Sequence, residues 1–360
     1  MPTDFRNILL IKPSSLGDIV HALPTAAVLR RRFPAASLTW LVKREWADVL
    51  EGNPCIDRVL TVDLSLAGWP ETVRAVRRGR FDLVVDLQGL FRSAFLGWLS
   101  RAAVRIGFAD GREGSHWFYT RRVVVPDSPM HAVERYLLIP RALGTAPQPG
   151  ALEFPLAVDP TAEIKLSQLL SSAGILPGTA LVAVNAGARW PTKQWSPAAF
   201  AQVADRLQKE GIRVLVIGGA AEHHPATAVL RHMVTSPMDL VGKTGIKDLI
   251  ALLRRVRLVI TNDSGPMHLA AALGTRVVAL FGPTDPGRTG PYGPGHMVFH
   301  SGVSCSPCLS RRCANPKALE CLTSISPEEV FRQALAMVRD SGGIEESTRG
   351  SLMQLKKIQT

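Results

Sequence analysis

Short apolar segments separated by helical patterns recur along both halves of the chain, and this alternation constrains the fold more than any other feature. The first segment, NILLIK at residues 7–12, has no polar alternation, which is typical of a strand buried on both faces of a parallel sheet. The predicted strands are 7–12, 38–42, 59–62, 83–87, 104–108, 181–184, 212–217, 239–241, 258–260 and 276–281. Helical patterns lie near 19–33, 72–78, 131–143, 161–173, 197–210, 222–234 and 246–255. This order predicts an α/β fold of doubly wound parallel sheets.

The alternation of strands and helices stops in a stretch rich in glycine and proline and then restarts, which predicts two domains. We expect an N-terminal Rossmann-like domain at residues 1–155, a linker at 156–178 and a second Rossmann-like domain at 179–340. The last 20 residues, 341–360, are polar and are expected to form a frayed tail. Two such domains facing each other would leave a cleft at the carboxyl ends of both sheets, where ligands bind in this class of fold.

The charge of the chain indicates an anionic partner. Its formal charge is +12, with 20 basic and 14 acidic residues in 1–150 and 22 and 16 in the remainder, so the excess is spread evenly. Nucleic acid is a weak candidate, because only 6% of residues are aromatic and no recognition motif is present. No apolar run approaches the roughly 20 residues of a membrane span, and the run at 8–11 is too short for a secretory signal. Five cysteines, an odd number, favour a reducing cytoplasm.

The segment TNDSGPMH at residues 261–268 follows a predicted buried strand and leads directly into a helix. Asp263 or Ser264 can cap that helix, and its first N–H groups would then point beyond the end of the strand. Free amides and the helix dipole together suit a phosphate group. Taken alone, however, the segment is more typical of an ordinary capped turn.

Asp18, in the segment SSLGD at residues 14–18, occupies the corresponding place after the first predicted strand. Its carboxylate either stabilises a helix N-terminus or acts as a general base at the mouth of a cleft, and the spacing does not separate these alternatives. His21, one turn later, is more typical of a packed or capping histidine.

The segment ARWPTKQW at residues 188–195 places Arg189, Thr192 and Lys193 between two tryptophans. A solvated basic loop is the usual interpretation, but exposed tryptophans are uncommon unless they pack or bind a ligand, so a diphosphate site is the alternative. Other nucleotide motifs are missing. The segment GKT at 242–244 lacks the earlier glycine of a P-loop, since residue 237 is proline, and no GxGxxG, DxD or HExxH occurs.

Four cysteines near the C-terminal end have the spacing C-x2-C-x4-C-x7-C: Cys305, Cys308, Cys313 and Cys321. The first pair has zinc-ligand spacing, but the second is too loosely spaced for a zinc ribbon. Reduced thiols are the preferred interpretation, with structural zinc as the alternative.

Taken together, the motifs resemble those of bacterial heptosyltransferases of glycosyltransferase family 9. The resemblance covers nearly the whole chain and rests on six segments in the family's order: SSLGDIVHALP (14–24), DLQGLFRS (86–93), HAVERY (131–136), GARWPTKQW (187–195), TNDSGPMH (261–268) and FGPTDP (281–286). It implies a GT-B fold, with two Rossmann-like domains facing across a cleft. It also implies inverting transfer of a heptose from ADP-L-glycero-D-manno-heptose to the lipopolysaccharide inner core, with no obligate cofactor and Mg²⁺ at most stimulatory.

The resemblance also implies roles for individual residues. Asp18 would be the general base. The donor site would comprise Arg189, Thr192, Lys193, Asp263, Ser264, Gly265, His268, Thr284 and Asp285. The acceptor site would comprise Ser15, Gly17, Gln88, Gly89, Arg92, Arg112, His131 and Arg135. The basic cluster that the family's first enzyme carries after its third strand is absent here, where residues 66–70 read LAGWP.

For the acceptor, the chain is most like heptosyltransferase I, and heptosyltransferase II is the alternative. The form SSxGDxxHxLP resembles heptosyltransferase I, which adds heptose to the Kdo of Kdo2-lipid A, whereas TNDSGxMH and the CxPC loop are commoner in heptosyltransferase II and other members. A nucleotide-sugar epimerase and a non-catalytic binding protein are the alternatives outside this activity. A heptosyltransferase with this charge is expected in the cytoplasm, held peripherally at the anionic inner face of the membrane.

Overall fold

The computed structural model describes residues 4–63, 65, 67–146, 152–219 and 223–340, so the predicted tail at 341–360 lies outside the described residues. The chain divides into two compact units, Met1–Val158 and Asp159–Thr360. Within the described ranges, no helix is both long and apolar enough to cross a membrane.

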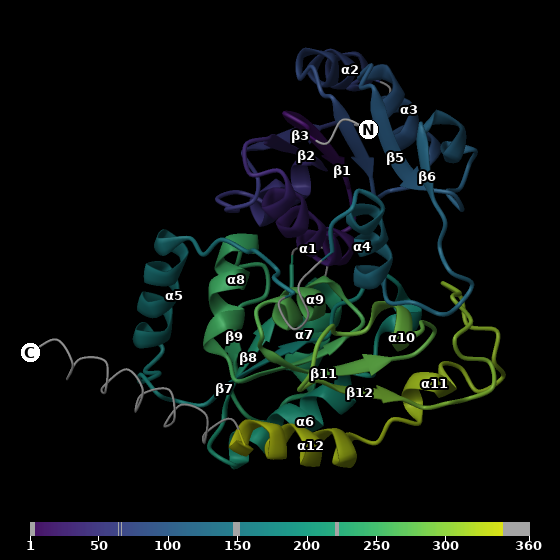
Figure 1. Cartoon of the computed structure of the whole chain (residues 1–360). Helices are drawn as coiled ribbons and strands as arrows, with labels where there is room; N and C mark the ends of the chain where they lie inside the picture. Colours follow the sequence, from purple (N-terminus) through teal and green to yellow (C-terminus); the bar gives the residue numbers. More distant parts are fainter. Residues whose placement is uncertain (1–3, 64, 66, 147–151, 220–222, 341–360) are drawn as a thin grey trace, which may run out of the picture. The chain divides into compact units, whose positions relative to one another are not determined.

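The first unit is built on a six-stranded parallel sheet with the strand order β3-β2-β1-β4-β5-β6. Its strands are β1 (Asn7–Ile11), β2 (Ser37–Lys43), β3 (Arg58–Val62), β4 (Leu83–Asp86), β5 (Val104–Phe108) and β6 (Arg121–Val123). Its helices are α1 (Leu16–Arg32), α2 (Trp69–Arg78), α3 (Phe91–Leu99) and α4 (Ala132–Ala142), with 3-10 turns η1 (Arg44–Val49) and η2 (Ser115–Phe118). α1 packs against α4, and α2 packs against α3 (Figure 1).

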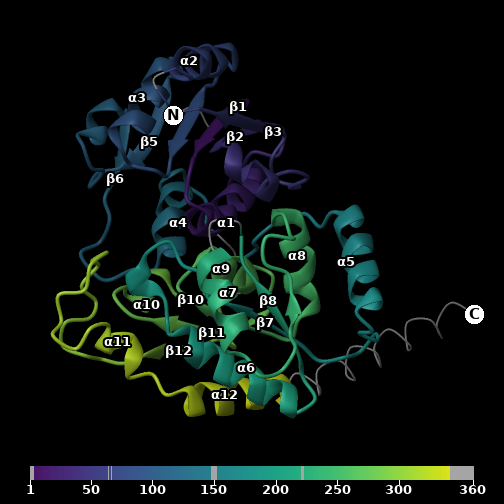
Figure 2. The same ribbon diagram turned by 180° about the vertical axis from the view of Figure 1, so that it is seen from behind.

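The second unit repeats this plan, with the order β12-β11-β10-β7-β8-β9. Its strands are β7 (Leu181–Asn185), β8 (Arg213–Ile217), β9 (Met238–Asp239), β10 (Leu258–Asn262), β11 (Arg276–Phe281) and β12 (Met297–His300). Its helices are α5 (Pro160–Ser172), α6 (Pro197–Lys209), α7 (His223–His232), α8 (Ile246–Arg255), α9 (Gly265–Ala272), α10 (Pro286–Thr289), α11 (Glu320–Thr323) and α12 (Pro327–Asp340), with the 3-10 turn η3 (Pro191–Lys193). Figure 2 shows the same elements from behind.

Each sheet reverses its strand order once, between β1 and β4 in the first unit and between β7 and β10 in the second. Because connections leave such a pair of strands in opposite directions, a crevice opens at their carboxyl ends, and ligands bind there in doubly wound folds. The loops after these four strands are therefore the places where a site is expected in each unit.

The predicted pair of doubly wound parallel sheets is confirmed, while several boundaries differ. The predicted helix at 19–33 begins at Leu16, because Ser15 is the N-cap and Asp18 stands at the third helical position in a capping box. Asp18 thus lies inside the first turn of α1. The strands β6 and β12 and the helix α3 were not predicted.

α5 occupies most of the stretch predicted as a linker, but it packs on α8 in the second unit. Lys165 Nζ lies 2.6 Å from Asp248 Oδ2, and Arg254 Nη1 lies 3.5 Å from Glu163 Oε1. This segment is therefore a structural part of the second unit.

Candidate functional site

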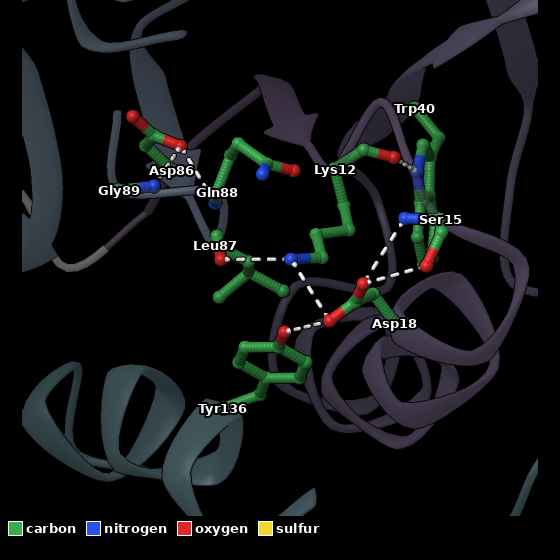
Figure 3. A network of polar contacts seen from close by, with 9 residues as sticks. All are labelled: Lys12, Ser15, Asp18, Trp40, Asp86, Leu87, Gln88, Gly89 and Tyr136. Carbon is green, nitrogen blue, oxygen red and sulfur yellow. Dashed lines mark hydrogen bonds and ion pairs between the residues drawn. The ribbon is translucent and has the colours of Figure 1, made fainter. Parts of the chain in front are cut away.

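Asp18 lies in the crevice of the first sheet, after β1, and its carboxylate receives four contacts. Oδ2 accepts hydrogen bonds from the backbone N–H of Ser15 at 3.1 Å and from the Ser15 hydroxyl at 2.9 Å. Oδ1 accepts one from the Tyr136 hydroxyl at 3.1 Å and lies 3.5 Å from Lys12 Nζ. Figure 3 shows the ammonium and the phenol converging on this carboxylate. The Asp18 side chain nevertheless remains 41% exposed, so a substrate can reach it.

These contacts set the charge of Asp18. Burial on its own would raise the pKa of the carboxyl, but the Lys12 charge and the hydrogen bonds from Ser15 and Tyr136 outweigh it and lower the pKa. Asp18 is therefore a carboxylate at neutral pH. Tyr136 stays protonated, because burial and the Asp18 charge raise its pKa well above its ordinary value.

Lys12 is the buried partner of this carboxylate, with a side chain only 4% exposed at the end of β1. Burial lowers the pKa of its ammonium, whereas the charges of Asp18 and Asp86 oppose that change. The ammonium also donates to the Leu87 carbonyl at 3.4 Å and lies 5.0 Å from the centre of the Tyr136 ring. Lys12 thereby connects the loops after β1 and β4, the two strands at which the sheet reverses.

The loop after β4 is shaped by Asp86, which is completely buried. Its carboxylate accepts from the backbone N–H groups of Gln88 and Gly89, from the Ser93 hydroxyl and from the Tyr119 hydroxyl, at 2.7–3.2 Å. Burial raises the pKa of this carboxyl in spite of those donors. Gly89 takes a φ of +66°, which favours glycine. Within the described residues, the amide oxygen of Gln88 is buried without a hydrogen-bond partner, which leaves an acceptor for a ligand.

The remaining predicted acceptor residues lie around this crevice with differing surroundings. Arg92 and Arg112 are exposed, and the Arg112 N–H donates to the Gly89 carbonyl at 2.9 Å. Arg135 makes a bidentate pair with Asp110 at 2.7 and 2.9 Å. His131 caps α4 by accepting from the Val133 N–H at 3.2 Å, and its ring meets that of His21 edge to face. Gly17 is buried in the first turn of α1.

A second polar cluster lies in the crevice of the other sheet, where Lys193, Asp263 and Thr284 meet. Lys193 Nζ lies 2.6 Å from Asp263 Oδ2, and the Thr284 hydroxyl donates to the same oxygen at 2.7 Å. Asp263 is 5% exposed and the Lys193 side chain 17%. The ammonium also lies 4.8 Å from the centre of the Trp190 ring. This cluster combines a cation, a carboxylate and a hydroxyl, a combination that can bind both phosphate and sugar hydroxyls.

A neutral hydrogen-bond network holds the start of α9 beside this cluster. The Asn185 amide donates to the hydroxyls of Ser264 at 2.9 Å and Thr261 at 3.2 Å, and these two hydroxyls lie 2.9 Å apart. Ser264 is the N-cap of α9, but its side chain makes no capping hydrogen bond, contrary to the predicted capping role. The amides at the start of α9 thus stay available to an anion, although Pro266 contributes none.

The other predicted donor residues have more local partners. The Thr192 hydroxyl donates to the Ser310 carbonyl at 2.8 Å and is buried, while Arg189 is exposed. Asp285 caps α10 by accepting from the Gly287 N–H at 2.8 Å. Gly265 is the first residue of α9, and His268, one turn later, is 8% exposed. Of the two tryptophans, Trp195 is packed in the core against Phe200 and only Trp190 borders the cluster.

The four C-terminal cysteines are free thiols. Cys305, Cys308 and Cys313 are exposed, whereas Cys321 is buried, and burial raises the pKa of its thiol. Over the described part of the chain, no group of three or more His, Cys, Asp or Glu side chains is arranged to hold a metal ion.

The sequence interpretation did not identify Lys12, Tyr136 or Asn185 as site residues. A lysine at the end of an apolar strand was a usable signal, because a strand buried on both faces leaves that ammonium at the crevice. Asn185 ends β7 in the same way. Tyr136 lies 118 residues from Asp18, and no local pattern relates the two.

Sequence comparison finds a matching family model and several relatives. The family model for glycosyltransferase family 9 (heptosyltransferase) matches residues 70–319. The chain is 29% identical to lipopolysaccharide heptosyltransferase 1 of Pseudomonas aeruginosa over 92% of this chain and 98% of the relative. It is 27% identical to lipopolysaccharide heptosyltransferase 2 of Salmonella typhimurium, over 79% and 85%.

Solved structures show the same fold. A glycosyl transferase family 9 protein from Veillonella parvula superposes with a TM-score of 0.82 at 27% identity, covering 94% of this chain and 99% of that one. The E. coli heptosyltransferase WaaC with ADP gives a TM-score of 0.68 at 24% identity, covering 92% and 99%.

Proposed function

The chain belongs to glycosyltransferase family 9, the heptosyltransferase family, and we propose that it transfers a heptose from ADP-L-glycero-D-manno-heptose to the Kdo of Kdo2-lipid A, with inversion and without an obligate metal. The observation that carries this proposal is the ionised, 41% exposed carboxylate of Asp18 in the crevice of the first sheet. A single displacement needs one such base for the acceptor hydroxyl and a stabilised leaving group at the donor.

The donor half of the reaction is assigned to the second unit. Lys193 has three N–H donors, so it can keep one on Asp263 and direct the others to the diphosphate. The amides of Ser264 and Gly265 at the start of α9 would add charge stabilisation as ADP leaves. Asp263 would accept from a heptose hydroxyl. The E. coli heptosyltransferase with ADP has the same fold, which supports an adenine nucleotide as the donor's leaving group.

The acceptor half is assigned to Asp18. The carboxylate would take the proton from the attacking hydroxyl while that oxygen forms the bond to the anomeric carbon and the bond to ADP breaks on the opposite face. A carboxylate has about four lone-pair sites, and in Asp18 all four are occupied: Ser15 makes two contacts, and Tyr136 and Lys12 make one each. The Lys12 contact is the longest at 3.5 Å, so we expect the acceptor hydroxyl to replace it. Losing the nearby charge would also raise the pKa of Asp18 and make it a stronger base.

Binding of the acceptor would use groups that the first unit presents near Asp18. The free amide oxygen of Gln88 can accept from a sugar hydroxyl. Arg92 and Arg112 are exposed cations suited to the carboxylates of Kdo. Arg135 is a weaker candidate than the sequence indicated, because both arms of its guanidinium already bind Asp110.

We further propose that the carboxyl edges of the two sheets face each other across a cleft, because the displacement needs both halves on one pair of substrates. The enzyme would work in the cytoplasm at the inner face of the membrane, where a charge of +12 favours anionic lipid.

Addition of the second heptose is the alternative acceptor reaction, favoured by the similarity to heptosyltransferase 2 of Salmonella typhimurium. One experiment separates the alternatives. Purified protein is incubated with ADP-heptose and either Kdo2-lipid A or its mono-heptosylated form, with and without EDTA, and the products are analysed by mass spectrometry and NMR. We expect heptosylated Kdo2-lipid A of inverted configuration in both conditions. Transfer only to the mono-heptosylated lipid indicates the second activity, and epimerised or free sugar without a lipid product indicates an epimerase or hydrolase.

A further inference from the structure

An aromatic cluster on the first unit has no part in the site described above. Its members are Trp69 on α2, Phe91, Phe95 and Trp98 on α3, and Trp117 and Phe118 on η2. Phe95 stacks on Trp69, Phe91 and Trp98, with ring centroids 5.6–6.3 Å apart. Phe118 meets Phe91, Phe95 and Trp98 edge to face at 5.5–6.4 Å. These contacts join five of the rings, whereas the ring of Trp117, the neighbour of Phe118 in η2, meets His116. The six side chains together are hereafter called the aromatic face.

Part of the aromatic face is open to solvent. Phe91 is 44% exposed, Trp98 48% and Trp117 75%, and these are the three exposed aromatic side chains among the exposed large hydrophobic residues of the described ranges. Phe91, Phe95 and Trp98 have the spacing i, i+4, i+7 and so share one side of α3. The other side, with Ser93, Ala94, Leu96 and Gly97, is buried. A helix that is apolar on both sides and partly exposed on one of them is typical of an interaction surface.

The surroundings of the aromatic face are basic. α2 and α3 together carry four arginines, Arg74, Arg77, Arg78 and Arg92, against one acidic residue, Glu71. One further carboxylate, that of Glu113, accepts from the Phe91 N–H at 3.2 Å. All four arginines are exposed, and Arg77 Nε donates to the Leu99 carbonyl at 3.3 Å, which places the end of α2 beside the end of α3. Figures 1 and 2 show the two helices side by side. Aromatic rings bordered by arginines match a bilayer surface, where rings enter the headgroup region and cations meet anionic lipid.

We propose that the aromatic face docks the protein on an anionic bilayer surface. Phe91, Trp98 and Trp117 insert at the level of the headgroups, and the arginines of α2 and α3 contact lipid phosphates. Charge complementarity favours lipid over a second copy of the chain, because two such arginine-bordered faces would repel each other. The proposal deepens, and rests on, the proposed transfer to a lipid-anchored acceptor. α3 begins two residues after Gly89, so docking would hold the acceptor crevice beside the lipid surface.

The test is co-sedimentation of the full chain with vesicles made of equal parts phosphatidylglycerol and phosphatidylcholine, or of phosphatidylcholine alone. We expect binding to the anionic vesicles, and a large loss of it between about 0.1 M and about 1 M salt, where the Debye length falls from about 10 to about 3 Å. The triple variant Phe91→Ser, Trp98→Ser, Trp117→Ser should bind at least tenfold more weakly. The control Ile164→Ser, Leu176→Ser, Val234→Ser removes three apolar side chains of the second unit that are on average more exposed, at 60%, 73% and 82%, and it should bind like wild type.

Brominated lipids give a readout that does not depend on the stability of the serine variant. They should quench the tryptophan fluorescence of bound wild type, whereas Trp98→Phe, Trp117→Phe should keep its binding and lose most of that quenching. Equal vesicle binding by wild type and the triple serine variant would overturn the proposal. So would a wild-type dimer that the serine variant splits while neither protein binds vesicles.

Failure of docking and failure of the proposed activity are distinguishable with a deacylated, water-soluble acceptor. If docking is correct, the triple variant transfers heptose to the soluble acceptor within about twofold of wild type but is impaired on the vesicle-embedded lipid. Transfer to both acceptors without vesicle binding would contradict docking alone. Vesicle binding without transfer to either acceptor would contradict the proposed activity alone.

Discussion

Replacing Asp18 by asparagine separates the chemical role of this carboxylate from its structural role. The asparagine side chain keeps one oxygen, which can still accept the Ser15 N–H, and its amide nitrogen can donate to the Tyr136 hydroxyl. The substitution removes the negative charge of the side chain and its capacity to take a proton. Because the native Asp18 side chain is 41% exposed, water can satisfy much of what remains unpaired on residue 18, whereas the Lys12 ammonium, 4% exposed, keeps only its hydrogen bond to the Leu87 carbonyl.

The substitution should change the rate of transfer much more than the free energy of unfolding. Loss of one or two charge-assisted hydrogen bonds at this half-exposed position should lower the free energy of unfolding by about 1–2 kcal/mol. Loss of a general base lowers the rate by about 10²- to 10⁴-fold, which at about 1.4 kcal/mol per tenfold raises the activation free energy by about 3–6 kcal/mol. The effect on transfer should therefore exceed the effect on folding.

The assay measures kcat/KM for transfer and, separately, the affinity for ADP by calorimetry. We expect transfer to collapse and ADP affinity to stay within about twofold, since the residues assigned to the donor lie in the second unit. Asp57→Asn is a matched control, because that carboxylate also has a lowered pKa and binds a backbone N–H and an arginine, away from the site. Near wild-type transfer by Asp18→Asn would refute the assignment of the base, and an equal loss in Asp57→Asn would indicate a folding defect.

Three more substitutions test other parts of the site. Tyr136→Phe removes a hydrogen-bond donor to Asp18, so the pKa of the Asp18 carboxyl should rise and the acidic limb of log kcat/KM should move to higher pH. An unmoved limb would contradict this coupling. Lys193→Ala should weaken ADP binding by about 10- to 100-fold in calorimetry, whereas Lys243→Ala, which breaks a surface ion pair of 3.1 Å, should leave it unchanged. Asp86→Asn should lower the free energy of unfolding, measured by denaturant titration, by about 2–4 kcal/mol, because an amide cannot accept from all four donors. Unchanged stability would show that the buried carboxylate is dispensable.

The sequence predicts the centre of each sheet well and its edges poorly. Central strands such as β1 and β10 are buried on both faces, so their apolar runs stand out from the flanking residues. β6 reads RRV, and nothing in three mostly basic residues indicates a strand, which forms because its backbone pairs with β5. The helix α3 is apolar on nearly every side, so it lacks the one-sided pattern by which a surface helix is recognised.

The site follows the same logic. Asp263 comes soon after a predicted strand and Asp18 follows another after a short turn, so their place near the carboxyl end of a sheet was predicted from the sequence. The side chains that contact these two residues cannot be predicted in the same way. The ion pair of Lys193 with Asp263 joins positions 70 residues apart, and the sequence assigned the two side chains to different parts of the donor rather than to each other. Local patterns report on burial and turns, whereas such contacts depend on how β7 and β10 are brought together.

The two crevices also differ in a way that fits separate chemical tasks. Where the first sheet reverses its strand order, β1 is followed by Lys12 and β4 ends in Asp86, and both of these charged side chains are buried. At the corresponding places in the second sheet, β7 ends in Asn185 and β10 ends in Asn262, which carry neutral amides. Buried charges are costly to hold, and they shift the pKa of any group beside them. Under the proposed mechanism, the first unit moves a proton and gains from this, because the neighbouring ammonium would keep Asp18 ionised until the acceptor arrives. The second unit would hold the diphosphate and gain more from neutral amides, which fix the start of α9 and would leave Lys193 to meet the charge of the leaving group.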